Sequence, residues 1–172
     1  NAFAKAAKYL CPSIRVLRVD GNDNEIKTNS LAAADIFCSL SDNIQETFGI
    51  TPIEAMASGI PCVVSDWNGY KDTVRDGIDG FRIPSLIPAE GYGNDLAFRY
   101  ALEIDTYDMY IGHTSNLISI DINRTASAFT KLINNHKLRN EMGKNAKQRS
   151  QNEYDWNNIL NKYTNLWDNL HQ

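Results

Sequence analysis

Two glutamates separated by seven residues, Glu46 and Glu54, are the side chains in this sequence best placed to do chemistry. A helix is predicted over 52–58, because Thr51 is a natural N-cap and Pro52 suits the first helical position. Glu46 would then lie on the preceding loop and Glu54 in the first helical turn. Each carboxylate could therefore meet a different part of one extended ligand.

The backbone amides of Phe48, Gly49 and Ile50 precede this predicted helix and are expected to face outward without partners. A helix N-terminus beside a small residue favours the binding of an anion. Two plainer interpretations stay open. Glu54 could return a hydrogen bond to the Thr51 amide in a capping box, and Gly49 could be an ordinary turn glycine.

The order of the predicted elements favours an α/β fold. Strand-like segments alternate with helix-like ones, which predicts a Rossmann-like parallel sheet with helices on both faces. Ligands of such sheets bind beyond the carboxyl ends of the strands, where the loop with Glu46 would lie. The predicted strands are Ile14–Val19, Asp35–Leu40, Ile60–Val64 and Phe81–Ile83, and a helix is expected over Asn29–Ala34, with Gly59 as the left-handed stop of the helix over 52–58.

The second half of the chain divides into two parts. Ser85–Thr114 is interpreted as an insertion or long connection, with a helical stretch near 95–104. From Asp121 onward the pattern is purely helical, and aromatic and aliphatic stripes there predict packing surfaces. The stripes are Ile122, Ala126, Phe129, Leu132 and Ile133; Leu138, Met142 and Ala146; and Trp156, Ile159, Leu160, Tyr163, Leu166, Trp167 and Leu170.

The segment around the two glutamates resembles the E-x7-E signature of retaining glycosyltransferases of the large group 1 family. Phe48-Gly49 lies between the glutamates, and Ala-Met-Ala-Ser-Gly-Ile-Pro follows Glu54. The resemblance extends from about Leu31 to Phe81 and, less specifically, into the C-terminal helices. It implies the C-terminal, donor-binding half of a two-lobed GT-B fold.

The resemblance also implies roles for single residues. Glu54 would accept hydrogen bonds from the two ribose hydroxyls of a nucleotide, and Glu46 would contact the donor sugar beside the reacting centre. The amides of Phe48, Gly49 and Ile50 would hold the diphosphate and stabilise it as the leaving group. Family members supply an Arg and a Lys for the diphosphate from an upstream segment, and no counterpart can be placed here.

Other residues near the predicted strand ends are weaker candidates. Asp42 and Asn43 precede Glu46 and are expected to approach the donor. Asp66, Trp67, Asn68 and Gly69 follow a strand and are expected to line the cleft, although the family often has Gly-Gly where Trp67 stands. A surface or interface role for Trp67 stays open. No Asp-x-Asp pair stands in a suitable setting, so no essential metal and no cofactor are predicted.

Charge is distributed unevenly along the chain, whose net charge is −4. Residues 20–108 contain sixteen acidic and five basic residues, so a diphosphate must depend on local donors. Residues 131–149 contain six basic residues and one acidic residue, which indicates a solvated helix face or, alternatively, contact with anionic lipid or a partner lobe. Nucleic acid is disfavoured as a partner because no aromatic residues interleave with these charges.

The three cysteines, Cys11, Cys38 and Cys62, fit neither a zinc pattern nor a disulfide framework. Cys38 and Cys62 lie in strand-like runs and are expected to be buried, which indicates a reducing, cytoplasmic setting, with the inner face of the membrane as an alternative. No apolar run is long enough to span a membrane. The sequence lacks an initiator Met, and we expect one nucleotide-sugar-binding domain over 1–172, a fragment inactive without its N-terminal acceptor lobe.

Three other functions were compared with this interpretation. A glycoside hydrolase also uses two carboxylates, but a helix N-terminus opposes the raised pKa that a general acid needs. A nicotinamide dehydrogenase would need G-x-G-x-x-G, which is absent. A non-catalytic nucleotide-binding module remains the alternative to a retaining transferase of polysaccharide or glycoconjugate synthesis. The nucleotide base, sugar and acceptor stay open.

Overall fold

The computed structural model describes residues 2–171. The chain divides into two compact units, 1–33 and 34–172. The first unit contains helices α1 (Ala2–Leu10) and α2 (Asn24–Ala33). Helix α2 begins five residues before the predicted helix, because the Asp23 carboxylate accepts hydrogen bonds from the amides of Glu25 and Ile26 and so starts the helix there.

The predicted strand Ile14–Val19 is wrong. These residues form no strand, and their side chains are exposed. Their β-branched character favours an extended backbone, but a strand also needs a hydrogen-bonded neighbour. Within the described part of the first unit the regular elements are both helices, so no such neighbour is present.

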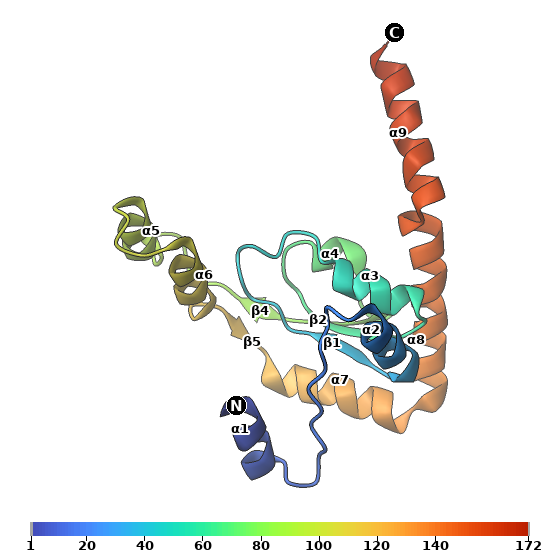
Figure 1. Cartoon of the computed structure of the whole chain (residues 1–172), viewed down its shortest axis with the longest axis horizontal. Helices are drawn as coiled ribbons and strands as arrows, with labels where there is room; N and C mark the ends of the chain where they lie inside the picture. The colour runs from blue at the N-terminus through green and yellow to red at the C-terminus, as the bar shows by residue number, and fades with distance from the viewer. Residues whose placement is uncertain (1, 172) are drawn as a thin grey trace. The chain divides into compact units, whose positions relative to one another are not determined.

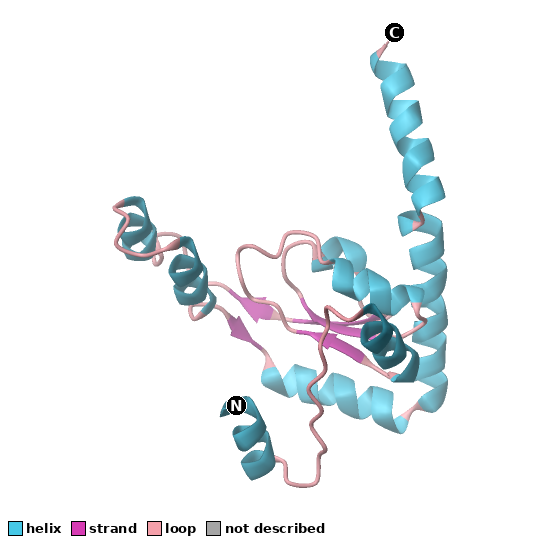
Figure 2. Cartoon of the chain, in the orientation of Figure 1, coloured by secondary structure: helices cyan, strands magenta, loops and turns pink. Residues whose placement is uncertain are grey.

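The second unit is built on a three-stranded parallel sheet, as predicted. Its order is β1-β2-β3, with Phe37 opposite Cys62 and Cys62 opposite Gly80. In Figures 1 and 2 the helices α3 and α7 lie on opposite faces of these strands. The bounds are β1 (Phe37–Ser39), α3 (Ile50–Ala57), β2 (Cys62–Ser65), α4 (Tyr70–Thr73), β3 (Gly80–Ile83) and α7 (Ile122–Asn134).

The central strand β2 is buried on both faces, as its continuous apolar sequence predicts. Val63 packs with residues of α7 and α8 (His136–Arg149), including Leu132 and Met142. The Cys62 thiol lies on the other face, 3.7 Å from the Pro52 carbonyl oxygen of α3. Burial raises the pKa of Cys62 far above its usual range, so this thiol is an inert packing group.

The predicted burial of Cys38 is wrong, because its side chain is exposed. Cys38 lies on β1, whose paired neighbour is β2 on one side only. An edge strand has fewer elements packed against it than the central strand carrying Cys62, so the same local sequence character gives a different burial.

Residues 85–120 form an arm between β3 and α7, in the place of the predicted insertion. The short strands β4 (Ser85–Leu86) and β5 (Ser119–Ile120) pair antiparallel at its base. Helices α5 (Asn94–Ala101) and α6 (Tyr107–Ser115) follow in the arm, and α5 covers much of the helix predicted there. Arg99 and the buried Asp105 form a bidentate ion pair, with its shorter contact at 2.7 Å.

The C-terminal elements are helical, as predicted, but their buried faces differ in part. The α8 stripe is confirmed by the burial of Met142 and Ala146. On α7 the buried residues are Thr125, Ala128 and Leu132, whereas the predicted Ile122 and Ile133 are exposed, because the sheet meets a face rotated from the most apolar one. A π-helical turn, η1 (Ser150–Tyr154), leads into α9 (Trp156–Leu170), which has no buried residue among those described.

The basic segment 131–149 is not a uniformly solvated face. Arg149 donates hydrogen bonds to the carbonyl oxygens of Asp72 and Thr73 at the end of α4, at 2.8 and 3.0 Å. Arg139 donates to the carbonyl oxygen of Leu132 at 2.9 Å. These two guanidinium groups join helices together, while Lys137, Lys144 and Lys147 stay exposed.

A buried carboxylate fixes the turn before β3. Asp79 is fully buried and accepts two side-chain hydrogen bonds from Arg75, at 2.7 and 2.8 Å, and one from the Arg75 amide. The Arg149 guanidinium lies 3.9 Å from the same carboxylate. Two positive groups therefore stabilise one buried charge.

We expect Asp79→Ala to lower the free energy of unfolding by about 2–4 kcal/mol, because it removes three charge-assisted hydrogen bonds from a buried site. Urea denaturation of the two proteins measures this difference. Asp35→Ala is the control: Asp35 pairs with Arg139 at 3.3 Å but is 77% exposed, so its loss should cost less than about 1 kcal/mol. Equal effects of the two substitutions would contradict the assigned role of Asp79.

Candidate nucleotide-sugar site

The loop of residues 41–49 joins the carboxyl end of β1 to helix α3, and residues at and just after the end of β2 hold it. The Ser65 hydroxyl donates a hydrogen bond to the Ser41 carbonyl oxygen, and the Trp67 indole N–H donates to the Asn43 carbonyl oxygen at 2.9 Å. Trp67, which the sequence left between a cleft role and a surface role, thus supports the loop. Its neighbour Asp66 lies 3.4 Å from Arg82 of β3.

Asn43 shapes the loop from within. Its side-chain oxygen accepts hydrogen bonds from the amides of Gln45 and Glu46, both at 3.0 Å, and its side-chain nitrogen donates to the Ser41 hydroxyl at 3.2 Å. This arrangement is an Asx turn. The half-buried Asp42 precedes it. Asn43 therefore positions the backbone of Glu46.

Tyr70, at the start of α4, connects the loop to the sheet. Its side chain is buried, and its hydroxyl lies 2.8 Å from the Ser39 hydroxyl of β1 and 3.3 Å from Oε2 of Glu46, to which it donates. Burial raises the pKa of Tyr70, and the nearby Glu46 carboxylate adds to this rise. The phenol is thus neutral at physiological pH and holds the Glu46 carboxylate in one place.

Two glycines allow the close packing around this phenol. Gly49 has φ +79°, and a Cβ at this position would overlap the Tyr70 ring. A Cβ on Gly69 would overlap the backbone of Thr47 and Phe48. Gly49 is therefore more than an ordinary turn glycine, because the loop and α4 approach more closely than any side chain would permit.

The predicted capping box at Thr51 is wrong. Helix α3 begins at Ile50, and its N-cap is Gly49, which makes no side-chain hydrogen bond. The left-handed conformation of Gly49 lets the chain enter the helix before Thr51, which becomes a helical residue. Glu54 accordingly lies in α3 and Glu46 on the loop, so the predicted separation of the two carboxylates is confirmed.

The amides predicted to bind an anion lie at the start of α3. Within residues 2–171, the N–H groups of Phe48, Gly49 and Ile50 donate no hydrogen bond. The Phe48 ring packs edge-on against Tyr154, with 6.3 Å between ring centroids. This contact and the Gly49–Tyr70 packing fix the backbone on both sides of the open amides, which the helix dipole makes favourable for negative charge.

Part of the chain resembles a known family. Residues 14–90 match the family model described as "Glycosyl transferases group 1". These residues are therefore similar to a group 1 glycosyltransferase domain. Glu46, Glu54 and the open amides all lie within the matched residues, whereas the C-terminal helices, to which the resemblance was expected to extend, lie outside them.

Curated relatives match about a third of the chain. A phosphatidyl-myo-inositol mannosyltransferase of Mycobacterium leprae (strain TN) is 39% identical over 64 residues, which cover 37% of this chain and 17% of that protein. The corresponding protein of Mycobacterium tuberculosis (strain CDC 1551 / Oshkosh) is 36% identical over 62 residues, covering 36% of this chain and 16% of that protein. The chain thus spans about a sixth of the length of the relatives it matches.

Tyr70 and Ser39 are the supporting residues that the sequence did not identify, whereas Gly69 was expected to line the cleft and instead allows α4 to pack closely on the loop. The sequence offered one signal for Tyr70, which is its position just after the strand-end residues Asp66–Asn68. Its contact with Glu46 could not be predicted, because the two residues are 24 positions apart in the sequence.

No helix among the described residues combines the length and apolar character needed to cross a membrane.

Tyr70→Phe tests the role of the phenol. It keeps the ring but removes two hydrogen bonds, so we expect it to lower the free energy of unfolding by about 1 kcal/mol at pH 7. The pKa of Tyr70 is raised in the folded state. Its contribution to the free energy of unfolding is therefore complete below a pH of about 10 and decreases as the pH rises further, because the phenol then ionises more readily in the unfolded chain. The difference between wild type and variant in urea denaturation should therefore shrink above that pH. A difference that grows would contradict the assignment.

Proposed function

We propose that this chain is the donor-binding part of a retaining glycosyltransferase that uses a nucleoside-diphosphate sugar. The observation that carries the proposal is the loop 41–49, in which a fixed Glu46 precedes three open amides at the start of α3. Similarity to the group 1 domain family supports the same function. We also propose that the full-length protein has an acceptor-binding lobe and transfers the sugar to an acceptor.

The proposed chemistry follows from the positions of the groups. The amides of Phe48, Gly49 and Ile50 donate hydrogen bonds to the diphosphate and stabilise the negative charge that develops when the bond to the sugar breaks. Glu46 contacts the donor sugar, and its position is held by Tyr70. Glu54, in α3, accepts hydrogen bonds from the two ribose hydroxyls.

Asp42 and Asn43 have different parts in this proposal. Asp42 lies half-buried on the loop and approaches the donor sugar. The side chain of Asn43 is engaged with Ser41 and with the amides of Gln45 and Glu46, so Asn43 acts by holding the loop in shape. No group of three or more His, Cys, Asp or Glu side chains suited to a metal occurs among the described residues, and the proposal assigns no role to a metal.

We also propose a cytoplasmic setting. The described thiols of Cys11, Cys38 and Cys62 are free, and two of them are exposed, which suits a reducing compartment. The names of the mycobacterial relatives describe enzymes that act on a lipid, which supports work near the inner face of a membrane. Exposed Lys137, Lys144 and Lys147 could contact anionic lipid there, whereas Arg149 is occupied by carbonyl groups of α4.

Calorimetric titration with UDP, GDP and ADP tests the donor site. We expect one nucleotide to bind and Glu54→Ala to weaken it about 10- to 100-fold, because a charge-assisted pair of hydrogen bonds is lost. Glu141→Ala, which removes an exposed carboxylate from α8, should leave the affinity unchanged and controls for net charge.

Thermal unfolding of both variants shows that any loss is not due to unfolding. If the nucleotide binds equally to wild type and Glu54→Ala, the ribose assignment is wrong. If a nucleotide binds as expected but the full-length protein transfers no sugar, the chain is a non-catalytic nucleotide-binding module instead.

A further inference from the structure

A pocket lies away from the loop 41–49, between β3 and α7. It has a volume of about 260 Å³ and is lined by Asp76, Phe81, Arg82, Ile83, Pro84, Arg124, Ser127, Ala128 and Lys131. Helix α7 covers the face of the sheet opposite α3 (Figure 1), so this pocket is separate from the open amides at the start of α3. The proposed function uses none of its residues.

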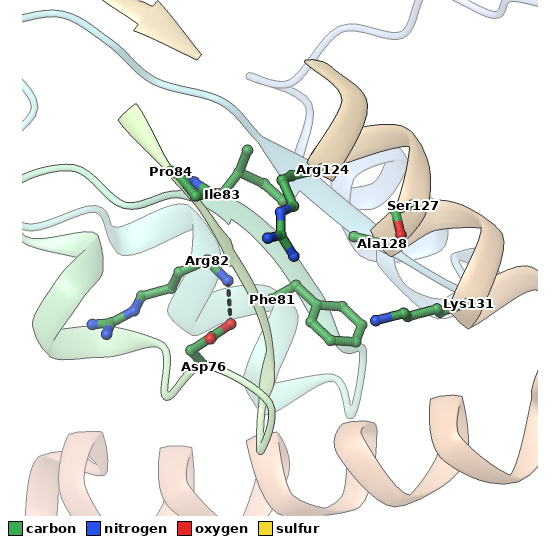
Figure 3. A pocket seen from close by; sticks show the side chains of 9 residues that line it. All are labelled: Asp76, Phe81, Arg82, Ile83, Pro84, Arg124, Ser127, Ala128 and Lys131. Carbon is green, nitrogen blue, oxygen red and sulfur yellow. Dashed lines mark hydrogen bonds between the residues drawn. The ribbon is translucent and has the colours of Figure 1, made fainter. Parts of the chain in front are cut away.

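Two cations on α7 enter this pocket without an acidic partner. Figure 3 shows Arg124 and Lys131 extending from the helix toward the ring of Phe81. The Lys131 ammonium lies 5.6 Å from the centre of that ring. Within residues 2–171, neither side chain forms an ion pair with a carboxylate, although the chain as a whole is acidic.

The spacing of three polar residues on α7 would let them bind one ligand group. Arg124, Ser127 and Lys131 occupy positions i, i+3 and i+7, so they lie along one stripe of the helix. Arg124 is in the first turn of α7, where the helix dipole adds positive potential. Two cationic donors and a hydroxyl between them form a binding arrangement for phosphate oxygens.

The opposite part of the pocket has different chemistry. Asp76 accepts one hydrogen bond from the Arg82 amide, at 2.8 Å, and its carboxylate receives no other among the described residues. The Arg82 guanidinium is engaged elsewhere, since it donates to the Lys71 carbonyl oxygen at 2.7 Å. Phe81, Ile83 and Pro84 supply an apolar wall between Asp76 and the cations. A carboxylate oxygen is thus available to accept from a hydroxyl group.

We propose that this pocket binds the phosphate of a hydroxylated phosphate ester, such as a sugar phosphate or a glycerophosphate headgroup. Arg124, Ser127 and Lys131 bind the phosphate, Asp76 accepts from a hydroxyl of the ligand, and the C–H face of its carbon skeleton packs on Phe81. The volume exceeds what inorganic phosphate needs, and the apolar wall would be unused by a bare ion.

Titration of the ¹⁵N-labelled chain with glucose 6-phosphate, followed by NMR, tests this site. We expect the amides of Phe81, Arg124, Ser127 and Lys131 to shift, and Arg124→Gln/Lys131→Gln to weaken binding about tenfold or more. Lys137→Gln/Lys144→Gln makes the same change in net charge on α8 and should leave the binding of glucose 6-phosphate intact; it does not serve as the control for vesicles, because these lysines are proposed to contact anionic lipid. Glucose without phosphate should produce no shifts.

Asp76→Asn tests the carboxylate end of the pocket independently of its cationic end. It should weaken glucose 6-phosphate severalfold but leave inorganic phosphate unaffected, because only the ester offers hydroxyl groups. Vesicles of phosphatidylglycerol, compared with phosphatidylcholine, distinguish a lipid headgroup from a free ester as the source of the phosphate. Binding to either source that the Arg124/Lys131 double variant abolishes supports the pocket.

Three results would overturn the proposal: no shifts at millimolar ester and no binding to phosphatidylglycerol vesicles, equal loss of glucose 6-phosphate binding in the two double variants, or shifts confined to Phe48–Ile50. The last result would mean that the ester occupies the donor site. Nucleotide binding that fails while glucose 6-phosphate still binds would reject the donor assignment and leave this pocket in place.

Discussion

The packing of the Tyr70 ring against Gly49 is the contact on which the candidate site depends. No residue with a side chain fits at position 49, because the ring occupies the place of its Cβ and φ is positive. The same phenol binds Glu46 and Ser39. One buried aromatic residue therefore fixes the carboxylate and the start of α3, where the open amides lie.

The C-terminal helices support this contact from outside the family match. Arg149 binds the carbonyl oxygens that end α4, the helix that begins with Tyr70. Tyr154, one turn further on, donates to the Asp72 carbonyl oxygen at 3.3 Å and packs against Phe48. The end of α8 and the following π-helical turn thus hold both α4 and the donor loop. Their basic residues serve packing as well as solubility.

The sequence predicted the three-stranded sheet and the placement of Glu46 on a loop and Glu54 in a helix, because both signals are local. The apolar run of β2 and the spacing of Glu46 and Glu54 can be recognised without knowing any neighbour. The start of α3 could not be predicted in this way. Thr51-Pro52 is a good local beginning for a helix, but the positive φ of Gly49, stabilised by its packing against Tyr70, moves the start to Ile50.

The remaining errors also arise from tertiary context. Ile14–Val19 has the composition of a strand, yet pairing decides whether a strand forms. Cys38 and Cys62 lie in similar sequences, but one is on an edge strand and the other on the central strand. Arg149 belongs to a run of charges that suggests solvent, and only the fold shows that it binds carbonyl groups.

The central claim is that the amides of Phe48, Gly49 and Ile50 are held open for a diphosphate. Amide chemical shifts of the ¹⁵N-labelled protein, recorded during titration with the nucleoside diphosphate that calorimetry selects, test it most directly. We expect these three amides to shift most and to saturate together with the heat of binding. Saturable binding that leaves them unmoved, with the main shifts elsewhere in the chain, would contradict it.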